Sequence, residues 1–282
     1  MGCGGSKAKS FEEVVSKPAF KQSLLQFRTL QLSQSDLKKI YKVFVTMDID
    51  GSGTISLAEL LAHLDLPRTA YTEKIFTIFD DDGSGAIDFR EFVLSVWNYC
   101  TLSKVNLDMF AFDLYDTDGS GELSPPEVIK LLQEIFGKNE MKTDVHAKSA
   151  MAEIAQFQAK KVKFDPIKFH HFMSNHQALM FPSIQMQQAL HKKVCGAGFW
   201  EKHRKHREAR SHGVYMSLAH FIMSPEEMSL PNISSANSVV SGCESHSSLP
   251  FNSSLNGSLA ASSPLPDKAA AASQMKAMVS GM

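Results

Sequence analysis

The chain has 282 residues, a formal net charge of -1 and 43% hydrophobic residues, which is enough for one or two domains with a packed core. The balanced charge offers no general attraction to nucleic acid, and no apolar run approaches the roughly 20 residues of a membrane-spanning helix. Four cysteines without a C-x-x-C pair and a start without the apolar stretch of a secretory signal lead us to expect a cytoplasmic protein.

The first nine residues, MGCGGSKAK, are small, glycine-rich and basic, which predicts a flexible arm. They match the pattern for N-myristoylation, with Gly2 as the acceptor once Met1 is removed. Because one myristoyl chain holds a protein at a membrane only weakly, a palmitoyl chain on Cys3 would complete the attachment. We therefore expect acylation at Gly2 and Cys3 and a peripheral position at the inner leaflet, on the cytoplasmic face of a membrane; an unmodified arm is the alternative.

Residues 33–177 hold a repeated unit that reads as helix, loop and helix. Phe44, Phe76 and Phe112 each stand four residues before a loop, and apolar residues recur at helical spacing after every loop. Helix-start patterns at Ser10 and Ser33 indicate that helical structure begins before the repeats. The predicted organisation is an N-terminal arm and helix at residues 1–32, pairs of units at 33–100 and 101–177, a basic segment at 178–212 and a tail at 213–282.

Three of the loops have twelve residues and offer oxygen atoms in a fixed order. Calcium is a hard cation that takes about six to eight oxygen ligands, which such a loop supplies from its side chains and one backbone carbonyl. The sixth position is glycine in every loop, because the backbone needs a positive φ there. We therefore predict three Ca²⁺ sites. Their ligands are Asp48, Asp50, Ser52, the Thr54 carbonyl and Glu59; Asp80, Asp82, Ser84, the Ala86 carbonyl, Asp88 and Glu91; and Asp116, Asp118, Ser120, the Glu122 carbonyl and Glu127.

A fourth unit keeps the apolar framework but not the ligands. With its loop placed at Ala155–Pro166, alanine, phenylalanine and proline stand where carboxylates are needed, so we expect no calcium there and interpret the unit as a structural partner of the third. The eighth positions of paired loops should form short β contacts. This predicts pairing of Ile55 with Ile87 and of Leu123 with Val162.

The residues after the repeats are basic and then serine-rich. Phe181–Val194 carries a partial apolar stripe, and a basic run follows at residues 199–210. This segment has three possible uses: docking in the protein's own groove, contact with anionic lipid, or a solvated charged helix. Serine, asparagine and glycine dominate the sequence beyond it, which predicts a disordered tail.

A set of apolar residues at helical spacing allows two interpretations. They form ordinary core, or they line a groove that calcium opens for the amphipathic helix of a target protein. The residues are Phe92, Val96, Trp97, Leu131, Leu132 and Phe136. The chain contains no phosphate-binding glycine loop, nucleophile elbow or kinase motif, so we predict that it is not an enzyme and has no catalytic residues.

The segments IFDDDGSGAIDFREF, at residues 78–92, and FDLYDTDGSGELS, at residues 112–124, resemble the calcineurin B-like branch of the EF-hand proteins. The resemblance covers residues 33–175. It implies an all-α fold of four EF-hand units in two paired lobes, and regulation of a partner enzyme. The ligand-poor fourth unit and the long C-terminal extension depart from calcineurin B.

Two functions are compatible with these features. The first is a membrane-associated calcium sensor that changes conformation and regulates a target, such as a protein phosphatase or kinase. The second is a calcium buffer, which binds the ion with little movement of its helices. The acylation motif favours the sensor, because a buffer gains little from being held at a membrane.

Overall fold

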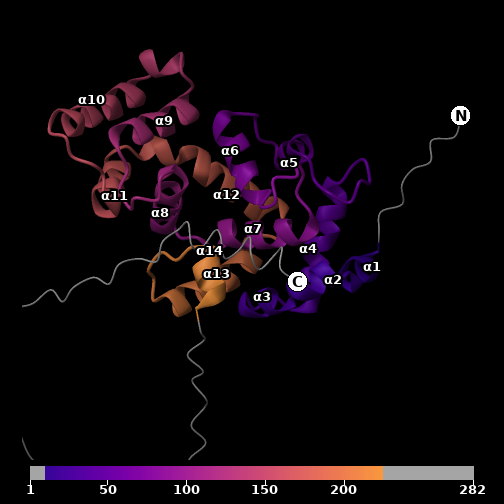
Figure 1. Cartoon of the computed structure of the whole chain (residues 1–282). Coiled ribbons are helices and arrows are strands. Elements are labelled where there is room, and N and C mark those ends of the chain that lie inside the picture. Colours follow the sequence, from indigo (N-terminus) through magenta and orange to yellow (C-terminus); the bar gives the residue numbers. More distant parts are fainter. Residues whose placement is uncertain (1–9, 225–282) are drawn as a thin grey trace, which may run out of the picture. The chain divides into compact units, whose positions relative to one another are not determined.

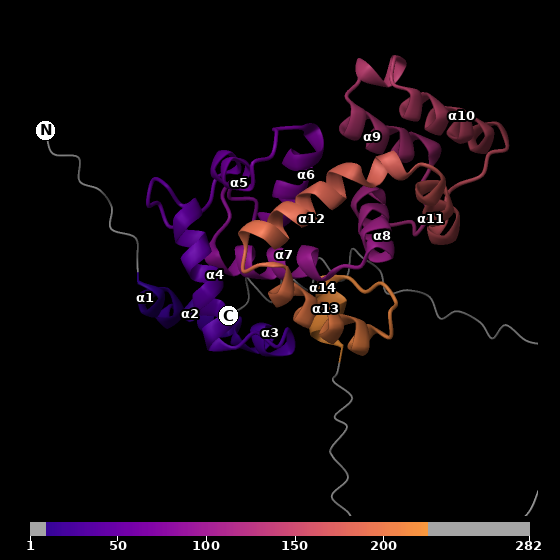
Figure 2. The same ribbon diagram turned by 180° about the vertical axis from the view of Figure 1, so that it is seen from behind.

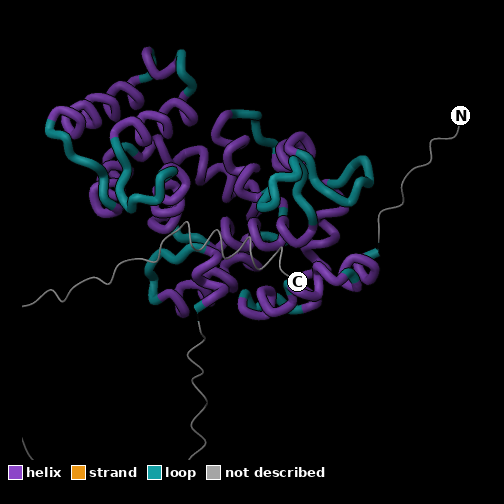
Figure 3. The backbone as a smooth tube through the Cα atoms, viewed as in Figure 1, coloured by secondary structure: helices purple, strands orange, loops and turns teal. Residues whose placement is uncertain are grey.

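The computed structural model describes residues 10–224, and in this range all regular elements are helices (Figures 1 and 3). Gly2, Cys3 and the tail beyond Ser224 lie outside the described residues. Between residues 10 and 224 no helix is long and apolar enough to cross a membrane. The helices are α1 (Phe11–Ser16), α2 (Pro18–Gln22), α3 (Leu24–Thr29), α4 (Gln34–Met47), α5 (Leu57–Leu64), α6 (Ala70–Phe79), α7 (Phe89–Thr101), α8 (Lys104–Tyr115), α9 (Pro125–Phe136), α10 (Val145–Ala159), α11 (Pro166–Asn175), α12 (Phe181–Lys193), α13 (Ala197–Ser211) and α14 (Leu218–Met223), with 3-10 turns η1 (Glu140–Lys142) and η2 (Gln177–Met180).

The first lobe consists of α4 to α7. Ser33 caps α4 in a capping box with Asp36, and the apolar face of α4 buries Phe44 and Met47 in the core. Ile55 and Ile87 form an antiparallel bridge, with both N–H···O distances at 2.8 Å, as the sequence predicted. Each loop therefore satisfies two backbone groups of the other, which holds the two units together.

The second lobe consists of α8 to α11, and here the predicted register is wrong by two residues. Leu123 pairs with Phe164 rather than with Val162. Phe164 is fully buried and stacks on Phe157, with ring centroids 4.1 Å apart, whereas Val162 stays partly exposed. The larger aromatic side chain takes the buried position because its burial removes more apolar surface from water. Because α10 continues to Ala159, the fourth loop is also shorter than predicted.

Three short helices precede the lobes and pack on the first of them. Pro18 is the first residue of α2 and separates it from α1. Phe11 and Phe20 are buried, and the ring of Phe20 stacks on that of Phe89 with centroids 5.7 Å apart. The described N-terminal region is therefore part of the core of the first lobe.

The helices after the second lobe return to the first (Figures 1 and 2). Helix α12 packs against α5 and α7, and α13 packs against α7. Of the three uses left open for the basic segment, the structure shows docking on the protein itself. The predicted start of the disordered tail at residue 213 is too early, because α14 is helical. Its Phe221 is fully buried, and the ring centroids of Phe221 and Trp97 are 5.1 Å apart.

Candidate metal centre

Each of the three loops joins the last residue of one helix to the first turn of the next. Asp48, Asp80 and Asp116 are the C-terminal caps of α4, α6 and α8. The ninth residue of each loop caps the outgoing helix, and the twelfth, a glutamate, completes the capping box. The glutamate is therefore held by the helix that leaves the loop. Any force on its carboxylate acts directly on that helix.

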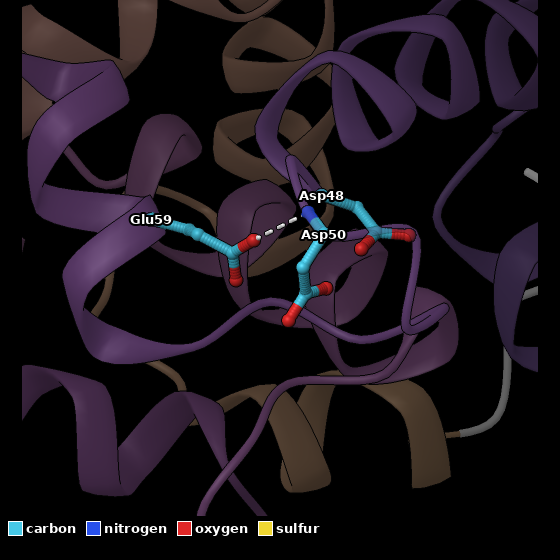
Figure 4. Close-up of side chains that lie close together, drawn as sticks. All are labelled: Asp48, Asp50 and Glu59. Carbon is cyan, nitrogen blue, oxygen red and sulfur yellow. Dashed lines mark hydrogen bonds between the residues drawn. The ribbon is translucent and has the colours of Figure 1, made fainter. Parts of the chain in front are cut away.

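In the first loop, the side chains of three carboxylates lie close together (Figure 4). One oxygen from each of Asp48, Asp50 and Glu59 lies within 4.8 Å of the others. The Gly53 N–H donates to Asp48 Oδ2 at 2.9 Å, and Gly53 has a φ of 86°, a value that favours glycine. Glu59 Oε1 accepts from the N–H groups of Ile49 and Asp50, at 2.9 and 3.5 Å. The loop therefore folds around its own carboxylates.

The second and third loops repeat this geometry. Their clusters have the same 4.8 Å limit between carboxylate oxygens. The glycine N–H at the sixth position again donates to the first aspartate, at 2.9 Å in the second loop and 3.1 Å in the third. The clusters consist of Asp80, Asp82 and Glu91, and of Asp116, Asp118 and Glu127.

The serines and backbone carbonyls predicted as ligands lie next to each other. The hydroxyl at the fifth position donates to the carbonyl at the seventh in every loop, at 2.8 to 3.0 Å. The pairs are Ser52 with Thr54, Ser84 with Ala86 and Ser120 with Glu122. Asp88 differs from the other predicted carboxylate ligands, because its Oδ1 accepts from the Glu91 N–H at 2.8 Å and it is not part of the second cluster.

The electrostatics of the clusters fit a hard divalent cation. Hydrogen bonds from the serine at the fifth position lower the pKa of Asp50 and Asp82, which favours their charged forms. Glu91 is only 2% exposed, and burial raises its pKa, an effect that the Asp88 N–H partly offsets. Oxygen-only ligands and mutually repelling carboxylates suit Ca²⁺, whose charge would relieve the repulsion.

Two groups near these loops were missed by the sequence analysis. Arg90 Nη2 lies 3.9 Å from Glu91 Oε1 and 3.6 Å from Asp81 Oδ2. In the second lobe the Tyr115 hydroxyl donates to Glu134 at 2.7 Å, and Lys74 Nζ of the first lobe lies 3.6 Å from the same carboxylate. Charged residues beside a loop are a weak signal in sequence, because their partners depend on how the helices pack.

The fourth loop contributes to none of the carboxylate clusters found among residues 10–224. Counting from Phe164 at the eighth position, Lys168 stands where the other loops have glutamate, and its Nζ lies 2.5 Å from Asp165 Oδ2. The histidines in this lobe pair separately, His170 with Asp108 at 2.8 Å and His176 with Glu153 at 2.9 Å. A positive side chain at the twelfth position disfavours a cation in this loop.

Comparison with known proteins agrees with this geometry. Residues 37–95 match the family model described as an EF-hand domain pair, and residues 111–132 match the one described as EF hand; these domains indicate calcium binding. The calcineurin B subunit of Naegleria gruberi is 38% identical over 109 residues, which are 38% of this chain and 61% of the relative.

Two further relatives have similar sequence identity and coverage. The type 1 calcineurin B subunit of Dictyostelium discoideum is 32% identical over 111 residues, 38% of this chain and 60% of the relative. The type 2 calcineurin B subunit of Homo sapiens is 30% identical over 105 residues, 37% of this chain and 62% of the relative. The chain thus spans about three-fifths of the length of these relatives.

Proposed function

We propose that this chain, a calcineurin B-like EF-hand protein, is a calcium sensor that binds three Ca²⁺ ions and regulates a partner protein. The observation that carries the proposal is the position of the twelfth-residue glutamate in each loop. Glu59, Glu91 and Glu127 belong to a carboxylate cluster and also to the first turn of α5, α7 or α9. Ion binding and helix position are therefore coupled.

The aspartates and the glutamate of each loop would have different roles in holding the ion. Bound Ca²⁺ would supply the positive charge that the clustered carboxylates lack. The aspartates at the first and third positions of each loop would hold the ion, together with the glutamate of the outgoing helix. Glu91 Oε1 accepts from the N–H groups of Asp81 and Asp82 at 3.1 and 3.2 Å, so a bound ion would compete with these hydrogen bonds for this oxygen.

The partner is proposed to be a phosphatase or kinase. The relatives are named as subunits of calcineurin, which supports a regulatory role within a larger assembly.

We place the sensor at the inner leaflet of a membrane, held by acyl chains on Gly2 and Cys3. The support is the sequence motif at the N-terminus. Mass spectrometry of the protein from its native cell tests this part: both acyl groups are expected, and a free Gly2 would contradict it.

A calcium buffer is the second candidate, and one observation favours it. The residues predicted to line a target groove are core in this structure: Phe92, Val96, Trp97 and Leu132 are fully buried, Leu131 is nearly so, and Phe136 is partly buried. A protein whose helices stay in this arrangement after binding calcium would offer a target no groove.

An apolar reporter dye separates the two functions. With the full chain, a sensor should raise the dye fluorescence with Ca²⁺ but not with Mg²⁺. The triple variant Glu59→Gln, Glu91→Gln, Glu127→Gln is the control and should show no rise. A wild-type protein that binds calcium without any fluorescence change would support the buffer instead.

A further inference from the structure

Helices α13 and α14, residues 197–223, form a cover over α7 (Figures 1 and 2). The buried residues of α13 are spaced three or four apart, so they form one stripe along the helix. Trp200 is fully buried, and His203 and Arg207 are each 1% exposed. In α14, Phe221 packs on Trp97 of α7. The cover thus sits on α7 as an amphipathic helix sits on its receptor.

The cover buries a positive charge without a negative partner. The Arg207 guanidinium donates to Asn98 O and Oδ1, each at 2.9 Å, to Thr101 Oγ1 at 3.0 Å and to Met216 O at 2.6 Å. Its remaining neighbours include the rings of Trp97 and Phe221, with Cζ 5.4 and 5.9 Å from their centroids. No carboxylate between residues 10 and 224 forms an ion pair with it, and burial lowers its pKa to about 10.

Other polar atoms in this interface lack partners altogether. Trp97 Nε1, His203 Nε2 and Ser211 Oγ are buried and make no hydrogen bond within the part of the chain that the structure describes. Unsatisfied buried groups oppose the packed state, because water would satisfy them. A buried charge without a counter-ion opposes it in the same way. Ring contacts and the Arg207 hydrogen bonds thus hold the interface, and these buried groups oppose it.

Helix α12 differs from α13 in its polar contacts. It also packs on α7, but its buried polar side chains are neutral and make hydrogen bonds. Gln187 Nε2 donates to the carbonyls of Tyr99 and Leu102 at 2.9 Å, and His191 Nε2 lies 2.8 Å from Cys100 O. Ser183 bonds with the Tyr71 hydroxyl. The turn between α12 and α13 contains Cys195, a residue other than glycine with a φ of 61°, which L-residues disfavour. This turn separates α12 from the cover formed by α13 and α14.

The surface under the cover belongs to the helix that leaves the second loop. Glu91 lies in the first turn of α7, and Asn98 and Thr101 lie two to three turns further along the same helix. A movement of α7 toward an ion at Glu91 would shift these acceptors relative to α13. Arg207 would lose hydrogen bonds that nothing else in the interface replaces.

We propose that α7 carries a helix-binding surface for an arginine-bearing amphipathic helix, and that the cover is its displaceable internal occupant. The fitting partner is a helix with an aromatic residue seven positions before an arginine on its apolar face, as Trp200 stands before Arg207. Release of the cover by calcium at the second loop rests on the proposed function. The helix-binding surface on α7 does not depend on that function.

Hydrogen exchange of the full chain, read by mass spectrometry, tests the release. In Ca²⁺ the amides of residues 197–223 should exchange at least about tenfold faster than in Mg²⁺, while those of α12 change little. Calcium binding is measured by calorimetry on the same sample. Bound calcium with unchanged exchange of the cover would overturn the calcium-driven release but leave the calcium sites standing.

A labelled peptide with the sequence of residues 197–223 tests the surface independently of calcium. The full-length Trp200→Ala variant, with its helix content checked by circular dichroism, removes a fully buried ring of the cover and leaves the sequence of α7 unchanged. This variant should bind the peptide in Mg²⁺. A peptide carrying Arg207→Ala should bind at least about tenfold more weakly, and one carrying Lys205→Ala, whose side chain is 74% exposed, should bind normally. The helix-binding surface would be overturned if the folded Trp200→Ala variant did not bind the peptide. It would also be overturned if the wild-type, Arg207→Ala and Lys205→Ala peptides bound equally.

Discussion

The twelfth residue of each loop combines two tasks, a helix cap and a calcium ligand. Glu91 is the most buried of the three, at 2% exposure, and its Oε2 accepts from the Asp88 N–H at 2.9 Å. A neutral amide at this position keeps the shape but loses the charge that attracts the ion. The consequences should therefore appear in calcium binding before they appear in folding.

Glu91→Gln should weaken the second site by at least about tenfold and leave the first and third sites nearly unchanged. Calorimetric titration with Ca²⁺ in a Mg²⁺ background measures this. Glu73→Gln is the matched control, because Glu73 is exposed and pairs with Arg68 outside the loops. An unchanged titration for Glu91→Gln would refute the ligand assignment of the second loop.

Arg90 is expected to compete with the ion for Glu91. Its guanidinium is partly exposed and lies 3.9 Å from Glu91 Oε1, so removing it should strengthen calcium binding at the second site by about two- to fivefold. Arg90→Ala is compared with Arg68→Ala by the same titration at low ionic strength. Weaker binding in Arg90→Ala would show instead that the arginine orders the loop.

At the residue scale, the sequence predicted the metal centre better than its surroundings. Aspartate, glycine and glutamate at fixed spacing are local signals, and the structure clusters three carboxylates in each loop where that spacing places them. Asp88 caps α7 and lies outside the cluster of Asp80, Asp82 and Glu91, so its role as a ligand stays a prediction. Arg90 was missed, because the ion pairs of a charged side chain depend on packing that the sequence pattern does not contain.

At the scale of elements, the short β bridge couples the third loop to the ligand-poor fourth. Phe164 is fully buried and has Phe157 and Phe172 within ring-contact distance, with centroids 4.1 and 5.4 Å away. Its backbone exchanges two hydrogen bonds of 2.8 Å with Leu123. Packing in the fourth unit therefore supports the geometry of the third.

Phe164→Ala should destabilise the second lobe by about 3 to 5 kcal/mol and weaken calcium binding at the third loop. Urea denaturation gives the free energy of unfolding, and titration gives the affinity. Ile167→Ala, at a side chain that is 82% exposed, should change neither. If Phe164→Ala is as stable as Ile167→Ala, the revised register of the fourth unit is wrong.

The contact of α13 with the first lobe should depend on pH through His203. Burial lowers the pKa of His203 below its usual 6.5, and Lys202 and His206 act in the same direction, whereas Asp36 and a Leu30 backbone hydrogen bond oppose them. Between the lowered pKa and 6.5 the unfolded chain binds more protons than the folded one, so the free energy of unfolding falls as the pH drops through this window.

His203→Gln should lose less stability than the wild type when the pH falls from about 7.5 to about 5.5. Urea denaturation at both pH values measures the difference, and His146→Gln, on α10 in the second lobe, is the control for histidines in general. Equal losses in wild type and His203→Gln would mean that this imidazole does not set the pH dependence.

The elements show where local patterns stop being informative. Apolar spacing predicted the helices around the loops, and the capping box at Ser33 predicted the start of α4, because both act within a few residues. The register of the fourth unit failed by two residues, because Val162 and Phe164 both fit an alternating pattern and only three-dimensional packing distinguishes them. The helix α14 was missed because its short apolar sequence is stabilised by contact with Trp97, far away in the chain.

At the scale of the molecule, the two lobes and the C-terminal helices are connected through shared elements. Tyr115, which precedes the third loop, bonds to Glu134 of α9, and Lys74 of α6 lies beside the same carboxylate. Helix α7 carries Glu91 at one end and the contacts to α12 and α13 along its length. An ion in the second loop would therefore lie between α6, which contacts α9 of the second lobe, and α7, which contacts the C-terminal helices α12 and α13.

The central claim is that three loops bind calcium and the fourth does not. Calorimetric titration of the full chain in a Mg²⁺ background tests it most directly, with the triple Glu59→Gln, Glu91→Gln, Glu127→Gln variant alongside. We predict three Ca²⁺ ions per wild-type chain and none for the triple variant in the same concentration range. A wild-type stoichiometry other than three, or calcium binding that survives in the triple variant, would contradict the account.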